Sequence, residues 1–126
     1  LYEDFIFDRQ REHAPDDVMT IEHPLFTWDG SRLLGRLSKR QVHGGYALAG
    51  KAMDEQAAAA LTALETIMTA PGMRKKFYFE PGQIQIVNNK TCDHSRTAFT
   101  DWPEPERHRN LTRLWLRHEG RVFYNG

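Results

Sequence analysis

Residues 77–86 read Phe-Tyr-Phe-Glu-Pro-Gly-Gln-Ile-Gln-Ile, and their pattern sets the fold class that we expect. Phe77 and Phe79 are two residues apart, so a strand would place both on one face. Pro81-Gly82 is a turn pair, and Ile84 and Ile86 would share a face of a second strand. Strands that follow each other without an intervening helix indicate an antiparallel sandwich or barrel.

The sequence before this stretch predicts further strands. Residues 4–8 alternate polar and apolar side chains, and the polar residues 9–20 are expected to form a loop. Residues 25–28 predict a strand that ends at Asp29-Gly30. That dipeptide favours a tight turn, so we expect a hairpin with residues 32–37. Gly44-Gly45 is read as another turn or flexible joint.

One helix is predicted, from about Asp54 to Thr69. Its apolar residues recur at helical spacing and form a single stripe: Ala57, Leu61, Leu64 and Met68. Asp54 can cap the start of the helix, and Pro71-Gly72 would end it. We interpret this helix as structural and expect it to pack on the outside of a sheet.

A third strand is predicted from Leu111 to Arg117, and its two faces differ. If the strand extends back to Arg109, then Arg109 and Arg113 share a face with Leu111 and Trp115. Two guanidinium groups beside apolar side chains are costly unless an anion meets them. Arginine suits bidentate binding of carboxylates, so the face could bind small anions. The alternative is an edge strand whose arginines are solvated.

His94 precedes this strand by a short excursion. Neutral imidazole is the commonest metal donor in proteins, so a metal beside an anion site is geometrically reasonable. A lone histidine is nevertheless more often a surface or hydrogen-bonded residue. Arg96 has the same parity as His94, so it could orient the histidine from behind; a surface salt bridge is the alternative.

The order of these residues resembles the C-terminal signature of the TauD/TfdA family of Fe(II)/2-oxoglutarate-dependent dioxygenases. The matching segments are Gly82-Gln83-Ile84, Asn88-Asn89, His94-Ser95-Arg96-Thr97-Ala98-Phe99, Arg109 and Leu111-Thr112-Arg113-Leu114-Trp115-Leu116. The resemblance implies a mainly β fold with a flanking helix. That fold is a double-stranded β-helix, a cupin-like jelly roll. Residues 1–126 would form the C-terminal portion of a single domain of this kind.

The resemblance also implies roles for individual residues. His94 would be the distal iron ligand of a triad of two histidines and one carboxylate. Arg109 would bind the far carboxylate of 2-oxoglutarate, and Arg113 would contact an anionic end of the substrate. The implied cofactors are Fe(II), the cosubstrate 2-oxoglutarate and O2. The implied reaction oxidises a small organic substrate, by hydroxylation in the default case, and releases succinate and CO2.

The sequence departs from the family pattern at the metal site. The other two iron ligands of the family come from an earlier His-x-Asp or His-x-Glu motif. No histidine of this chain is followed two residues later by Asp or Glu; the six are His13, His23, His43, His94, His108 and His118. The chain would therefore supply one ligand of three and would be inactive alone. The rest would come from an N-terminal part of the same domain. The alternatives are a non-catalytic jelly-roll domain that binds anions without iron, and a structural or interaction module.

Composition narrows the partners. The chain has 126 residues and a formal net charge of zero, which gives no global electrostatic reason to bind nucleic acid or membranes. No apolar run approaches the length of a membrane-spanning helix, about 18 residues, and no signal peptide is visible. Cys92 is the one cysteine, which is compatible with a reducing cytoplasm. We therefore expect a cytoplasmic protein whose partner is a small molecule; homo-oligomerisation is left open.

Overall fold

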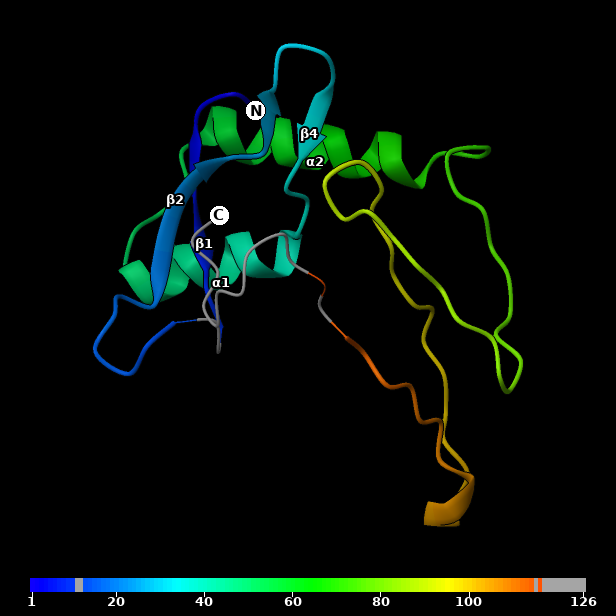
Figure 1. Ribbon diagram of the computed structural model, residues 1–126. Helices are drawn as coiled ribbons and strands as arrows, with labels where there is room; N and C mark the ends of the chain where they lie inside the picture. The colour runs from blue at the N-terminus through cyan, green and yellow to red at the C-terminus, as the bar shows by residue number, and fades with distance from the viewer. Residues whose placement is uncertain (11–12, 115, 117–126) are drawn as a thin grey trace.

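The first sheet is formed by the N-terminal residues. The computed structural model describes residues 1–10, 13–114 and 116. Strand β1 (Asp4–Asp8) pairs antiparallel with β2 (Thr20–Pro24), with Ile6 opposite Glu22 (Figure 1). The strand predicted at residues 4–8 is confirmed.

A short hairpin follows directly. Strand β3 (Phe26–Trp28) pairs antiparallel with β4 (Leu33–Gly35). Gly30 has a φ of 98°, which L residues rarely adopt, so glycine suits this turn. The Asp29 carboxylate accepts hydrogen bonds from the backbone N–H groups of Ser31 and Arg32, at 2.9 and 3.0 Å. The hairpin predicted from Asp29-Gly30 is therefore confirmed.

Helix α1 (Lys39–Ala49) contains Gly44-Gly45, so the turn predicted there is wrong. The helix packs directly against β1. A Cβ on Gly45 would lie 2.2 Å from the Ile6 carbonyl oxygen, so a larger residue would not fit without movement. Glycine is a poor helix former, yet here it allows two backbones to approach closely. Tertiary packing thus outweighs the local turn signal.

Helix α2 (Glu55–Thr69) confirms the predicted helix and its cap. The Asp54 side chain accepts a hydrogen bond of 2.8 Å from the Ala57 N–H. Leu61 is buried, and Ala57 and Leu64 pack against the same core.

The core lies between β1 and the two helices. Five buried side chains form it: Phe5, Phe7, Leu25, Val42 and Leu61. Three of them, Phe7, Leu25 and Val42, are almost completely shielded from solvent. These residues come from β1, the bend after β2, α1 and α2, so the core joins β1 and the two helices to the segment between β2 and β3.

The chain beyond α2 differs from our expectation. The strands predicted at Phe77–Phe79 and Ile84–Ile86 do not form, and no strand follows β4 among the described residues. The third predicted strand, 111–117, is not formed up to Leu114, while Trp115 and Arg117 lie outside the described residues. The intervening turn does form, because the Gln83 N–H donates to the Glu80 carbonyl at 3.1 Å. Backbone that pairs with no second segment cannot form a sheet.

The fold class is accordingly a mixed one within the described part of the chain. The two helices hold more residues than the four strands, and the expected double-stranded β-helix is not seen there. Residues 73–114 form neither α-helix nor strand. They run as extended chain with short turns and one 3-10 helix, η1 (Pro105–Arg107), which lies away from the core (Figure 1). None of the helices in the described ranges has the length and apolar character needed to cross a membrane.

Candidate functional site

The candidate site residues predicted from the sequence lie on residues 92–114, a segment that leaves the core and returns and that we call the excursion. Residues 92–104 run outward, the chain turns at η1, and residues 108–114 come back (Figure 1). The turn is closed by the His108 N–H, which donates to the Pro105 carbonyl at 3.1 Å. The Arg109 N–H donates to the Asp101 carboxylate at 2.7 Å, and this bond joins the outgoing and returning segments.

Two arginines meet at one aromatic ring on this excursion. The Arg96 Cζ lies 4.7 Å from the centroid of the Phe99 ring, and the Arg109 Cζ lies 5.2 Å from it. A guanidinium within about 6 Å of an aromatic centroid is attracted by the negative ring face. The two guanidiniums therefore share one aromatic ring, which sequence parity did not predict.

A third arginine makes a similar contact but has its own counter-ion. The Arg107 Cζ lies 3.4 Å from the Trp102 ring centroid, and its Nη1 is 3.7 Å from a Glu104 carboxylate oxygen. Both ends of this pair are about half exposed. The charge of Arg107 is thus already balanced within the turn.

The other predicted site residues are exposed and lie along the same excursion. His94 is exposed on the outgoing segment, and Arg113 is exposed on the returning segment, four residues after Arg109. Among the described residues, no group of three or more His, Cys, Asp or Glu side chains could hold a metal ion. A site with two histidines and one carboxylate needs three donors, so this part of the chain does not by itself fit an iron ion.

The turn at Asn88 anchors the excursion to the hairpin. The Asn88 side-chain oxygen accepts a hydrogen bond from the Lys90 N–H at 3.0 Å. The Asn88 backbone carbonyl accepts one from the Cys92 N–H, also at 3.0 Å. The Lys90 carbonyl in turn accepts from the Gly35 N–H at 2.8 Å. Asn88 therefore satisfies backbone groups, as such residues commonly do at turns.

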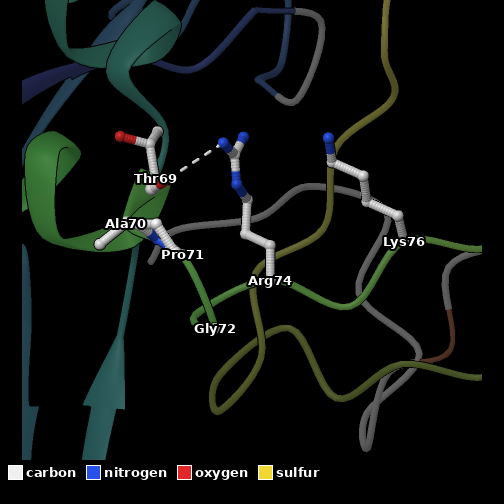
Figure 2. A pocket seen from close by; sticks show the side chains of 6 residues that line it. All are labelled: Thr69, Ala70, Pro71, Gly72, Arg74 and Lys76. Atoms are coloured by element: carbon white, nitrogen blue, oxygen red, sulfur yellow. Dashed lines mark hydrogen bonds between the residues drawn. The ribbon is translucent and has the colours of Figure 1, made fainter.

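Sequence reasoning missed a hollow at the end of α2. Its volume is about 360 Å³, and its lining residues are Thr69, Ala70, Pro71, Gly72, Arg74 and Lys76. Figure 2 shows the Arg74 side chain turned toward the Thr69 carbonyl, to which it donates at 3.2 Å. Basic side chains favour the carbonyl end of a helix, so Arg74 acts first as a cap. The basic run at residues 74–76, directly after a predicted helix end, was the available signal.

Comparison with known proteins covers nearly the whole chain. The family model described as "Taurine catabolism dioxygenase TauD, TfdA family" matches residues 2–115. FR-33289 synthase of Streptomyces rubellomurinus is similar, with 29% identity over 126 residues. The alignment covers 97% of this chain and 37% of the synthase, so the chain spans well under half of that relative. No solved structure matches the chain significantly.

Proposed function

The chain belongs to the TauD/TfdA family of dioxygenases, and from that premise we propose that the whole protein is an Fe(II)/2-oxoglutarate-dependent dioxygenase. It would oxidise a small organic substrate with an anionic group, with hydroxylation as the default outcome. The reaction would consume O2 and 2-oxoglutarate and release succinate and CO2. Iron would supply the oxidising chemistry, while the protein positions the two organic molecules and excludes water.

The observation that supports this proposal best is the placement of Arg109. Its backbone is tied to Asp101, and its guanidinium lies over Phe99. Fixing the stem of an arginine leaves its planar fork ready to bind a carboxylate through two parallel hydrogen bonds. We assign to Arg109 the far carboxylate of 2-oxoglutarate. Arg113, four residues further along the extended chain, is assigned to the anionic group of the substrate.

We assign only one iron ligand to this chain. We assign His94 as one iron donor, because its imidazole is exposed at the start of the same excursion. Among the described residues, no group of three or more His, Cys, Asp or Glu side chains could hold the metal. The remaining two ligands are therefore proposed to come from the rest of the whole protein. No other residue of this chain is assigned a direct part in the chemistry.

One observation favours a second candidate function. Because the described residues include no metal-binding group, a non-catalytic domain that binds anions without iron would also use Arg109. The two functions differ in one measurable respect. The dioxygenase converts 2-oxoglutarate to succinate when Fe(II) and a substrate are present, whereas the binding domain only binds it.

The test is succinate formation by the whole protein and three variants. We expect His94→Ala to abolish iron-dependent turnover with the fold retained. Arg109→Ala should raise the 2-oxoglutarate requirement about 30- to 1,000-fold, the loss of roughly 2–4 kcal/mol from a charged bidentate contact. Arg113→Ala should mainly weaken the substrate. Arg109→Lys should restore binding only in part, because a point charge lacks the fork.

Three results would contradict these assignments. Near-normal turnover by the His94 variant would remove it as a ligand. Unchanged 2-oxoglutarate titrations for both arginine variants would mean that both are solvated surface residues. Exchanged effects of the two arginine variants would keep the family but reverse their roles. Arg107→Ala is the matched control, since this nearby arginine is already paired with Glu104.

A further inference from the structure

In the Arg96–Phe99–Arg109 cluster, two guanidiniums contact one aromatic ring. Both guanidiniums lie within about 5 Å of the same ring centroid, although they come from the outgoing and returning segments. Neither is within ion-pair distance of a carboxylate among the residues that the structure describes. Phe99 itself is 43% exposed, so a small molecule from solvent can reach the cluster.

An external anion would balance the positive charges of the Arg96 and Arg109 guanidiniums. Two like charges around one ring repel each other, although water and salt screen much of the repulsion. The attraction of an exposed ring for each cation is modest. A carboxylate held by both guanidiniums would remove the repulsion and gain charge-assisted hydrogen bonds from both.

The neighbouring Arg107–Trp102 contact shows the difference. That arginine also lies over an aromatic ring, but Glu104 balances its charge. Among the described residues, the excursion therefore carries one arginine–aromatic pair with an ion-pair partner and one double pair whose guanidiniums have none. The unbalanced one is the better receptor for an external anion.

We propose that Arg96 is a second anion-binding residue. With Arg109 it would hold one carboxylate of a small dicarboxylic acid, and Phe99 would keep the two guanidiniums together. This gives Arg96 a direct contact with the ligand in place of an indirect role behind His94. The ligand's identity as 2-oxoglutarate rests on the proposed function, but the two-arginine site itself does not.

Succinate binding tests the two-arginine site separately from the proposed dioxygenase activity. It carries two carboxylates but lacks the keto acid that chelates iron, so its binding can be measured on the iron-free whole protein by calorimetry. We expect Arg96→Ala and Arg109→Ala each to weaken succinate binding about 10- to 100-fold. Phe99→Leu keeps the apolar volume and removes the ring face, so it should weaken binding by a smaller factor. Arg107→Ala should bind like the unaltered protein.

Further variants keep the result interpretable. Arg96→Lys retains the charge and should recover part of the affinity, which a merely structural role would not predict. Arg96→Ala/Arg109→Ala should lose less than the product of the two single effects, because both arginines hold one carboxylate. Unfolding midpoints of all variants identify any that fail to fold, and Arg96→Lys then carries the test.

The outcomes distinguish this inference from the proposed function. Unchanged succinate binding by a folded Arg96→Ala, with a loss in Arg109→Ala, would overturn the two-arginine site and leave the dioxygenase standing. Independent effects in the double variant would overturn the claim of one shared ligand. Equal competition by inorganic phosphate at matched ionic strength would reduce the site to general anion attraction. Binding that depends on both arginines, without any turnover, would support the site and refute the dioxygenase.

Discussion

Gly45→Ala is expected to destabilise the protein even though alanine is the better helix former. The added methyl would lie 2.2 Å from the Ile6 carbonyl oxygen and 2.6 Å from the Phe7 carbonyl carbon. Ordinary contacts begin near 3.4 Å, so α1 and β1 must separate by about 1 Å, and overpacking of this kind costs about 1–3 kcal/mol or more. Alanine returns about 1 kcal/mol of helix propensity. We expect a net loss of about 1–2 kcal/mol in the free energy of unfolding.

The matched control is the preceding glycine. A methyl on Gly44 would meet the Asp8 carboxylate at 3.0 Å and the Asp8 Cβ at 3.1 Å, a much smaller overlap than the one at Gly45. Gly44→Ala should therefore be neutral or stabilising by up to about 1 kcal/mol. Urea unfolding of both variants in the whole protein, followed by circular dichroism, measures the difference. If Gly45→Ala is as stable as Gly44→Ala, then α1 does not pack on β1 as closely as described.

Three further predictions concern the elements around the core. Asp54→Ala removes the bond to the Ala57 N–H and should cost about 1 kcal/mol in urea unfolding; no change would mean that the cap is not formed. Leu61→Ala empties a buried site and should cost about 2–4 kcal/mol in the same assay, whereas a loss below about 1 kcal/mol would place the side chain outside the core. The backbone N–H and then the hydroxyl of Ser31 lower the pKa of Asp29 below its ordinary value of 3.8. Stabilisation by this carboxylate is therefore present above that value and is lost as the pH falls through the lower, folded pKa. Ser31→Ala should raise the pKa of Asp29 partway back, measured by carboxyl carbon NMR, and an unshifted titration would exclude the hydroxyl.

Helix α2 and the β3–β4 hairpin were predictable because their signals are local. Asp54 precedes an apolar stripe and Pro71-Gly72 follows it, so both ends and the buried face are encoded within one segment. Asp29-Gly30 likewise contains the φ of 98° that its turn requires. Neither element depends on contacts that lie far away in the sequence.

The errors arose where distant contacts decide the structure. Gly44-Gly45 is typical of a turn when read alone, and only the closeness of β1 explains two glycines inside a helix. The alternation at Phe77 and Phe79 was real, since their ring centroids lie 5.5 Å apart on one side of the chain. Alternation predicts a strand only when a second segment supplies the hydrogen bonds, and the described residues supply none there.

The candidate site also combines residues that the sequence could indicate with a contact that it could not. Parity places Arg96 and Phe99 on opposite faces of a regular strand, because they are three residues apart. The irregular backbone instead lets both approach Arg109. The positions of His94, Arg109 and Arg113 could be assigned from the resemblance, but their roles stay predictions. No periodicity could have predicted that both arginines contact the Phe99 ring.

Hydrogen exchange of the Gly35 N–H, which donates to the Lys90 carbonyl, can report local opening of this part of the structure. This hydrogen bond joins the edge of β4 to the turn that begins the excursion, over a distance of 2.8 Å. Release of that turn would expose this amide to solvent while the ladder between β1 and β2 stays closed. The hydrogen-exchange rate at Gly35 would therefore measure how firmly the excursion is docked on the hairpin, separately from global unfolding. A ligand that tightens the excursion would slow exchange at this amide without touching it.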